Sequence, residues 1–415
     1  MIFLVINMPC YSHTIPTLGF ITELVKRGHT VDVISNSLIA PNIKGMIYST
    51  GARYIESLPV ENITDSEAEQ EQYHISKGKI SGRFQTAIIL TAYQHAERIN
   101  YNALIYDFFA FPVYYFSLML GVPVIRLCSN FAWNGQIVDR LAEDENTYKQ
   151  NVLARIFGDT IVGQMEWLAM KTLGFDFRMN ALGQEVLYNT PLLNIINVLK
   201  EMQPQAESFD ERFLFAPSVV PSPPGDLKIP YDKMKGKIIY ASFGTVFTTL
   251  EGDACINAFK EVIRSFKDTD ASVIISLGSA LPLKDLTDIP ENIFVYDFVP
   301  QTEVLQHASL FITHGGANSV NESIYYGVPM LVVPGGFDQF IMADQVEIRQ
   351  IGYKMEQGNF SARRLNELSF SILSDNEIYN NIRQLQSKMT SVDYNKAIAD
   401  RIEKFMSRLS GRFKL

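Results

Sequence analysis

The sequence of 415 residues predicts an α/β fold in which two doubly wound domains face a central cleft. Three observations lead to this prediction. Short apolar runs alternate with helical stretches early in the chain, a proline-rich segment follows near the middle, and the same alternation then restarts. Such alternation is typical of βαβ units, in which helices join parallel strands.

The first domain opens with the run IFLVI at residues 2–6, which we expect to be a buried strand. A helix is predicted over residues 16–27, with Pro16 in its first turn and Gly28 at its C-terminal cap. Further strands are expected at residues 30–34, 102–106 and 122–127.

The uncharged stretch from Phe108 to Ile125 is just long enough to cross a membrane. Pro112, Gly121 and Pro123 interrupt it, so we interpret it as a buried helix followed by a buried strand. Elsewhere in this domain we expect a polar loop at residues 61–79 and mainly helices at residues 130–200.

The segment Ala216–Asp226 contains four prolines and one glycine, which is typical of a stiff linker. After it, strands are expected at residues 237–242, 272–276, 293–296, 310–313 and 330–333, with a polar helix at residues 391–408. The predicted organisation is therefore an N-terminal domain at 1–216, a linker at 217–236, a C-terminal domain at 237–390, and a helix and tail at 391–415 that pack back on the N-terminal domain.

Composition limits the classes of partner. The formal net charge of −9 argues against a nucleic-acid binder, which needs a basic surface. Cys10, Cys128 and Cys255 are widely spaced and odd in number, as expected for reduced thiols. The N-terminus MIFLVINMPC has no basic region of a signal peptide. We therefore expect a cytoplasmic protein with no transmembrane segment.

Polar residues follow the expected strands at their carboxyl ends, where doubly wound sheets bind ligands. They are His13, Asp107, Gly244 with Thr245, residues 298–301, residues 314–316, and Asp338 with Gln339. Six placements at the same end of the strands favour a binding site over a purely structural role.

The stretch from Thr313 to Phe340 indicates the class of ligand. Gly315 and Gly316 allow a sharp turn, and a helix starting near Ala317 would offer N–H groups to an anion. Asn318 and Ser319 add donors in its first turn, and Glu322 could accept hydrogen bonds from sugar hydroxyls. A phosphate beside a ribose is a nucleotide. The alternative is an ordinary βα turn in which His314 caps a strand.

The sequence resembles the family-1, nucleotide-sugar-dependent glycosyltransferases of GT-B fold, in their bacterial macrolide and flavonoid branch. The C-terminal motifs that carry the resemblance are FVPQ at 298–301, HGGANSVNE at 314–322 and Asp338-Gln339. The N-terminal ones are SHTIPTL at 12–18 and RGH at 27–29. The GT-B fold consists of two Rossmann-like domains, which agrees with the organisation expected from the strands.

The resemblance implies a role for each matched residue. It implies that His13 is the general base on the acceptor hydroxyl and that Asp107 is its partner. It implies that the uracil lies on Phe298 and Val299, that the ribose lies on Gln301 and Glu322, and that Gly244, Thr245, His314, Gly316, Asn318 and Ser319 hold the diphosphate. Hydroxyls of the donor sugar would then bind Asp338 and Gln339. The acceptor pocket would use aromatic residues of the N-terminal domain, among them Tyr73, Phe84, Phe109, Phe131 and Trp133.

Three positions depart from the family pattern. Ser12 replaces the usual glycine, Phe298 the usual tryptophan, and Met342 a frequent asparagine. The first affects the shape of the loop at His13, the second reduces the stacking area, and the third replaces a polar side chain expected near the sugar by an apolar one.

The resemblance implies that a hexose is transferred from a UDP-sugar to a hydroxyl group of a hydrophobic small molecule, and Asp338-Gln339 suggests that the hexose is glucose. It also implies that the transfer inverts the anomeric centre and needs neither a metal nor a cofactor beyond this co-substrate. The alternatives are a lipid- or sterol-directed transferase at a membrane surface, a GT-B nucleotide-sugar epimerase, and a non-catalytic nucleotide-sugar-binding helper. No metal site is expected: Asp268-Thr269-Asp270 lies at the wrong end of its strand. His29 and His307 are expected to be structural.

Overall fold

The computed structural model describes residues 1–8, 10–38, 42–59, 82–110, 112–137, 191–221, 227–244, 252–278, 286, 288–336, 338–355 and 360–412. The expected loop at 61–79 and most of the helices expected at 130–200 lie outside these residues, as do Tyr73 and Thr245. The described residues form two compact units. One comprises those up to Val220 and from Asp393 onward, and the other those from Pro221 to Val392. The division falls inside the expected linker.

The first unit is built on a seven-stranded sheet in the order β3-β2-β1-β4-β5-β6-β7, in which each neighbouring pair is parallel. The strands are β1 (Ile2–Ile6), β2 (Thr30–Ser35), β3 (Arg53–Glu56), β4 (Ala103–Asp107), β5 (Val124–Cys128), β6 (Asn194–Ile196) and β7 (Phe213–Phe215). The order reverses between β1 and β4, which makes this pair the topological switch point of the sheet.

Helices cover both faces of this sheet. On one face, α1 (Tyr11–Lys26), α2 (Ile43–Ser49) and α17 (Tyr394–Arg412) pack against side chains such as Val5 and Ile105. On the other, α4 (Gly82–Arg98) and α5 (Pro112–Leu120) pack against Leu4 and Tyr106. The alternating strand side chains thus fill two separate cores, as a doubly wound sheet requires. Short 3-10 helices complete the unit: η2 (Phe108–Ala110), η3 (Lys200–Met202) and η4 (Ala206–Ser208).

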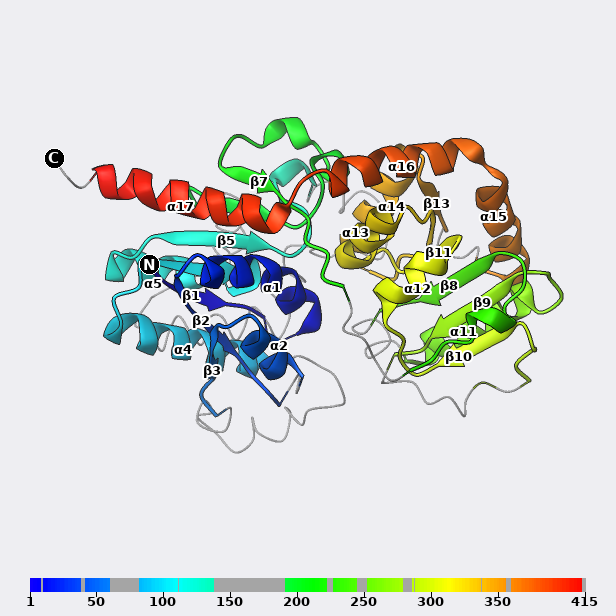
Figure 1. Ribbon diagram of the computed structural model, residues 1–415, viewed down its shortest axis with the longest axis horizontal. Helices are drawn as coiled ribbons and strands as arrows, with labels where there is room; N and C mark the ends of the chain where they lie inside the picture. Colours follow the sequence, from blue (N-terminus) through cyan, green and yellow to red (C-terminus); the bar gives the residue numbers. More distant parts are fainter. Residues whose placement is uncertain are drawn as a thin grey trace. The chain divides into compact units, whose positions relative to one another are not determined.

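The second unit contains a six-stranded sheet in the order β10-β9-β8-β11-β12-β13, again parallel throughout. Its elements are η5 (Tyr231–Lys233), β8 (Ile238–Ser242), α11 (Gly252–Phe266), β9 (Ser272–Ser276), β10 (Ile293–Tyr296), α12 (Gln301–His307), β11 (Leu310–Thr313), α13 (Ala317–Tyr326), β12 (Met330–Val332), α14 (Asp338–Ile348), β13 (Gly352–Lys354), α15 (Ala362–Ser374) and α16 (Asn376–Thr390). The switch point lies between β8 and β11. The two sheets confirm the predicted fold class (Figure 1).

Several elements differ from the expectation. The helix predicted from Pro16 begins at Tyr11, so His13 lies in its first turn and Pro16 is its sixth residue. Pro16 therefore gives up the backbone hydrogen bond that a residue there would donate to Ser12, a cost that the buried contacts of α1 offset. The three-residue strand β6 was expected to be helical, and β3, β7 and β13 were not expected at all.

The uncharged stretch from Phe108 to Ile125 forms α5 and the start of β5. The strand is buried as predicted, but the helix is buried on one face only, because Leu118 and Met119 are exposed. Within the described ranges, no helix has both the length and the apolar character needed to span a bilayer.

Candidate active site

His13 and Asp107 meet at the switch point of the first sheet. His13 lies just after β1, in the first turn of α1, and Asp107 is the last residue of the adjacent strand β4. The His13 Nδ1 atom lies 2.6 Å from the Asp107 Oδ2 atom. Because an ionised carboxylate only accepts hydrogen bonds, Nδ1 carries the proton and Nε2 is the nitrogen able to take up another. The pair therefore has the arrangement of an oriented general base.

The surroundings hold both groups in place. The Asp107 side chain is 1% exposed, and its Oδ1 accepts a hydrogen bond of 2.9 Å from the Phe109 backbone N–H. The Phe109 ring meets the His13 imidazole edge-on, with centroids 5.4 Å apart. His13 itself keeps 15% of its side-chain surface exposed, so it remains accessible.

A cavity within the first unit adjoins this pair. Its remaining walls are largely apolar: Pro16, Thr17, Phe20, Leu127, Cys128, Ser129, Ile195, Asn197, Ala216 and Ile398. Of the aromatic residues expected to line an acceptor pocket, Phe109 contacts His13, whereas Phe131 is fully buried against Trp133. Phe131 cannot therefore line an open pocket in this structure. Most of the residues that line this cavity were not predicted, because apolar side chains at strand or helix spacing are typical of a core.

In the second unit, His314 occupies the switch point between β8 and β11. A Cβ atom at Gly244 would lie 2.6 Å from His314 Cε1, and one at Gly316 would lie 2.5 Å from His314 Nε2. Gly244 also has a positive φ of 74°. Only glycine on both sides lets the two backbone turns close on the imidazole, which explains these two glycines.

Burial lowers the pKa of His314 to about 4, so the imidazole is neutral at pH 7. Its Nδ1 is buried and has no hydrogen-bond partner within the described structure. A neutral imidazole donates one hydrogen bond and accepts one. It can therefore meet an anion with a single N–H, but it brings no positive charge.

The helix α13 begins at Ala317, as predicted, after Gly315 with φ 85° and the N-cap residue Gly316. Gly316 contributes no side-chain hydrogen bond to the first turn. The N-terminal end of a helix carries a partial positive charge from its backbone N–H groups. Asn318 and Ser319 lie in this turn.

A hydrogen-bond chain joins Gln301, Ser319 and Glu322. The Gln301 Nε2 donates to Glu322 Oε2 at 2.5 Å and to Ser319 Oγ at 3.3 Å. The Tyr240 hydroxyl donates to Gln301 Oε1 at 3.2 Å and so fixes the orientation of the amide. The sequence indicated no role for Tyr240, since an aromatic residue in a buried strand is typical of core.

Burial raises the pKa of Glu322 to about 7, although the hydrogen bond from Gln301 lowers it. The carboxyl group is thus poised between its neutral and charged forms near neutral pH. Hydrogen bonds from vicinal hydroxyls would favour the charged form.

Phe298 and Val299 are adjacent but differ in accessibility. The Phe298 side chain is 66% exposed, whereas Val299 is buried. An exposed aromatic ring at a strand end offers a stacking surface. Val299 can contact a ligand only through its backbone.

Asp338 and Gln339 begin α14, and the Gln339 side chain is already engaged. Its Oε1 accepts hydrogen bonds from the backbone N–H groups of Gly335 at 2.8 Å and Gly336 at 3.2 Å. The amide NH₂ of Gln339 is therefore the part that can reach a ligand. Thr245 lies outside the described residues.

Asp268 and His307 are the other polar residues that the sequence singles out. Among the residues that the structure describes, no cluster of His, Cys, Asp and Glu could hold a metal ion. Asp268 is 85% exposed and pairs with Lys267 in the turn before β9, as expected for a solvated turn. His307 stacks on Tyr231 with centroids 4.0 Å apart, as a structural role would require.

Comparison with known proteins shows which proteins this chain is similar to. Residues 260–405 match the erythromycin biosynthesis protein CIII-like C-terminal domain. The chain is 28% identical to NDP-glycosyltransferase YjiC of Bacillus subtilis (strain 168) over 97% of both chains. It is 25% identical to the oleandomycin glycosyltransferase of Streptomyces antibioticus, over 96% of this chain and 89% of that protein.

Among solved structures, the calicheamicin glycosyltransferase CalG4 matches the fold with a TM-score of 0.74 at 23% identity, over 98% of each chain. The match extends through both units, and the sequence relatives span the same length. These matches confirm the resemblance to the family-1 glycosyltransferases of GT-B fold.

Proposed function

We propose that the protein transfers a hexose, glucose being the expected one, from a UDP-sugar to a hydroxyl group of a hydrophobic small molecule, with inversion at the anomeric carbon. The observation that carries this proposal is the hydrogen bond of 2.6 Å between His13 and Asp107, beside a cavity with largely apolar walls. A binding protein without catalytic activity has no use for an oriented base. The similarity to the oleandomycin glycosyltransferase favours a small-molecule acceptor.

In the proposed reaction, His13 Nε2 removes the acceptor proton while the acceptor oxygen attacks the anomeric carbon. A hydroxyl group is too weak a nucleophile unless a base takes its proton as the bond forms. The Asp107 carboxylate stabilises the resulting imidazolium through its bond to Nδ1. A single displacement inverts the anomeric centre.

The donor would occupy the second unit. We infer that Phe298 stacks on the base, that Glu322 and Gln301 bind the ribose hydroxyls, and that the first turn of α13 holds the diphosphate. Asp338 and the amide NH₂ of Gln339 would bind the sugar. Asn318, Ser319, Gly244, Thr245 and His314 complete the diphosphate site in this proposal. Because the helix end and these donors stabilise the leaving diphosphate, we propose that the reaction needs neither metal nor cofactor.

A cytoplasmic location is part of the same proposal. It rests on Cys10, Cys128 and Cys255, which are free and buried thiols.

A donor panel tests the proposal. The purified protein is incubated with several UDP- and TDP-sugars and a promiscuous phenolic acceptor, in EDTA and in magnesium buffer, and products are identified by mass. We expect a glycoside from UDP-glucose in both buffers, with the opposite anomeric configuration by NMR. Transfer that stops in EDTA would contradict metal independence, and absence of any glycoside would contradict the transferase itself.

A further inference from the structure

The Arg27-Gly28-His29 motif has no place in the site described above, although it follows the helix that carries His13. It terminates α1. Gly28 has a φ of 83°, its N–H bonds Val25 O at 2.9 Å, and the His29 N–H bonds Leu24 O at 3.1 Å. This is the hydrogen-bond pattern of a Schellman cap. The left-handed turn at Gly28 lets Arg27 and His29 contact the same carboxylate.

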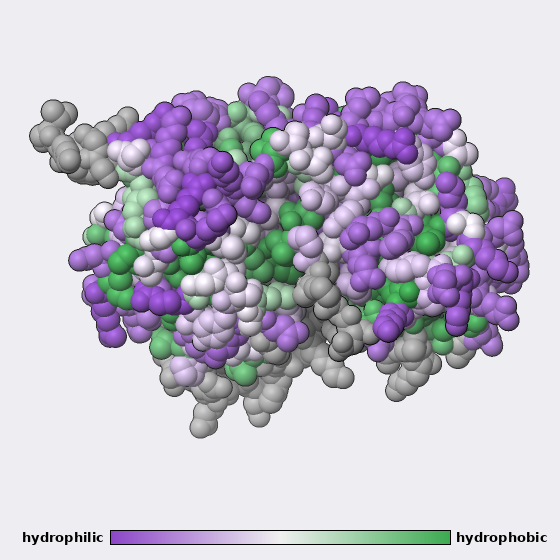
Figure 2. Space-filling view, in the orientation of Figure 1, coloured by the Kyte–Doolittle hydropathy of each residue, from purple (hydrophilic) through white to green (hydrophobic). Residues whose placement is uncertain are grey.

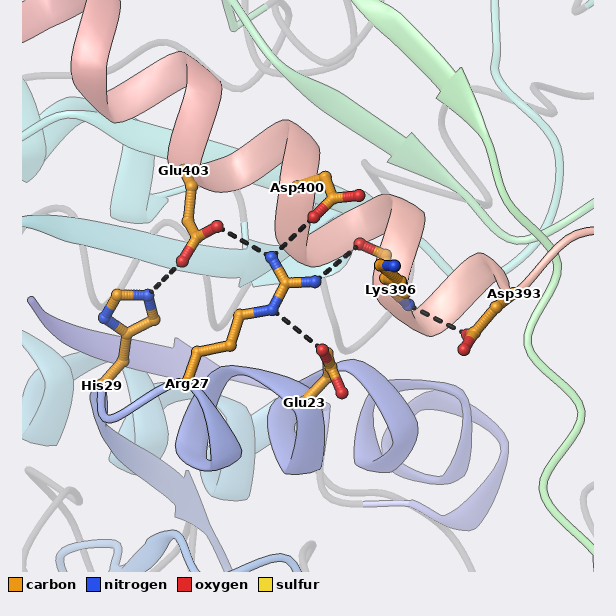
Figure 3. Close-up of polar contacts among 7 residues, drawn as sticks. All are labelled: Glu23, Arg27, His29, Asp393, Lys396, Asp400 and Glu403. Atoms are coloured by element: carbon orange, nitrogen blue, oxygen red, sulfur yellow. Dashed lines mark hydrogen bonds and ion pairs between the residues drawn. The ribbon is translucent and has the colours of Figure 1, made fainter.

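Both side chains bind the C-terminal helix α17 (Figure 3). Arg27 Nη1 donates to Asp400 Oδ1 and to Glu403 Oε2, each at 2.7 Å, while Nε donates to Glu23 Oε1 at 2.9 Å. His29 Nε2 donates to the other oxygen of Glu403, Oε1, at 2.8 Å. The hydrogen bond from His29, together with that from Arg27, lowers the pKa of Glu403, so this carboxylate is charged. We call this set of residues the α17 clasp.

The same two helices touch at two further levels. Near the start of α17, a Cβ atom at Gly19 would overlap the side-chain amide of Asn395, so glycine at this position lets the Asn395 side chain pack against α1. One turn beyond Asn395, the buried residue Ile398 lines the cavity whose walls include His13 and Asp107. The helix α17 is thus part of the wall around the base, and the clasp lies at the other end of α1.

We propose that the α17 clasp is a positioning device for the base: Arg27 and His29 hold α17 against α1 so that Ile398 and the first turn of α1 keep His13 in register with the acceptor hydroxyl. This inference rests on the proposed role of His13. Arg27 and His29 are positioning residues, because neither touches a reacting atom.

The physical basis is the stiffness of a helix. His13 and Arg27 are on one helix and about 21 Å apart along its axis at 1.5 Å per residue. A helix this short tilts as a body when one end loses its contacts. A displacement on the order of 1 Å at a catalytic group can cost about 10²-fold in rate. The clasp lies in a surface where hydrophilic side chains gather over α17 (Figure 2), so its removal exposes no large apolar area.

The test uses Arg27→Gln and, as a milder second variant, Glu403→Gln, in the full chain. The matched control is Lys404→Gln, which removes one charge from an exposed position of α17. Each variant is assayed with UDP-glucose and two acceptors, an aliphatic alcohol and a nitrophenol already ionised at the assay pH. UDP affinity and the melting temperature are measured alongside, and assays are run well below the lowest melting temperature.

We expect Arg27→Gln to lower kcat with the alcohol by about 10- to 100-fold, Glu403→Gln by less, and Lys404→Gln by no more than about twofold. All three should keep nitrophenol turnover and UDP affinity within about twofold, because an ionised acceptor needs no base. Equal losses with both acceptors, or wild-type alcohol turnover in both clasp variants, overturn the proposal.

His13→Ala, assayed in parallel, separates the two hypotheses. If it retains full alcohol turnover, the general-base assignment is wrong and the positioning role is overturned with it. If it loses alcohol turnover while Arg27→Gln and Glu403→Gln do not, only the positioning role is wrong.

Discussion

The titration of Glu322 gives a prediction that depends on geometry seen in the structure. Burial raises the pKa of this group from 4.5 to about 7, against the hydrogen bond from Gln301. A ribose that donates hydrogen bonds from two hydroxyl groups to the Glu322 carboxylate requires the charged form of that carboxylate. Donor binding should therefore strengthen as pH rises through 7 and release a proton below that pH.

The size of the effect follows from the ionised fraction. With a pKa of about 7, the carboxylate is about one-tenth charged at pH 6 and about nine-tenths charged at pH 8, so the affinity should rise by about tenfold. Glu322 keeps some solvent exposure, which reduces the shift, so about threefold is the lower limit we expect. His314 does not contribute, because its pKa of about 4 leaves it neutral throughout this range.

The assay is calorimetry with UDP-glucose, whose phosphate groups do not titrate near neutral pH, unlike the terminal phosphate of UDP. Glu322→Gln should bind more weakly and lose the pH dependence. Proton release is measured by repeating the titration in buffers of different ionisation enthalpy. An affinity that is flat from pH 6 to pH 8 in the wild type, or a pH dependence that survives in Glu322→Gln, would refute the assignment of this carboxylate to the ribose.

The same shift has a consequence for stability. A carboxyl group whose pKa is higher in the folded state than in the unfolded state binds its proton more tightly when folded. The stability that this group contributes is present below pH 4.5 and is lost as pH rises through about 7. In the absence of ligand, the unfolding free energy of the wild type should therefore fall relative to that of Glu322→Gln over this interval.

Four further substitutions separate the proposed roles. His13→Ala should cut turnover of an alcohol acceptor by about 10² to 10⁴-fold and leave UDP affinity within about twofold. Asp107→Asn should lower turnover by a smaller factor. Steady-state kinetics measures the turnover, and calorimetry measures the UDP affinity. Asp338→Ala should lower turnover with the UDP-sugar but leave UDP affinity nearly unchanged, and equal effects on both ligands would exclude a sugar contact. His314→Ala should weaken UDP binding by about 0.5–1.5 kcal/mol, the range for a neutral hydrogen bond, because the imidazole carries no charge at pH 7. A larger loss of UDP affinity in calorimetry would indicate a charged contact.

The fold could be predicted from sequence wherever a strand was a continuous apolar run. The runs at β1, β8 and β11 are such strands, and each is buried on both faces. The strands that escaped prediction are short or lie towards a sheet edge. β6 and β7 have three residues each, and β3 carries the charged residues Arg53 and Glu56 at its ends. Three residues give no period to detect, and an edge strand needs fewer apolar side chains.

The residues of the site were predictable where glycine or charge marked them, and the contacts between them were not. Gly244 and Gly316 stood out as turn residues, but only the structure shows that both close on one imidazole. Tyr240 was hidden because its ring belongs to the strand and only its hydroxyl reaches Gln301. Arg27 and His29 were conspicuous, yet their partners Asp400 and Glu403 come more than 370 residues later, a pairing that no local pattern can indicate.

The two units place different chemistry at the same topological position. In each sheet the strand order reverses beside the first strand, and the two loops that leave this point must diverge. In the first unit the loops bring an acid and an imidazole together, and a helix begins so early that the imidazole lies in its first turn. In the second unit, glycines occupy the corresponding turns, so the backbone itself and a neutral imidazole form the site. An imidazole oriented by a carboxylate suits proton transfer, whereas N–H groups at the start of a helix suit an anion. The fold supplies the position in both units, and the side chains at that position decide which half of the proposed reaction each unit would serve.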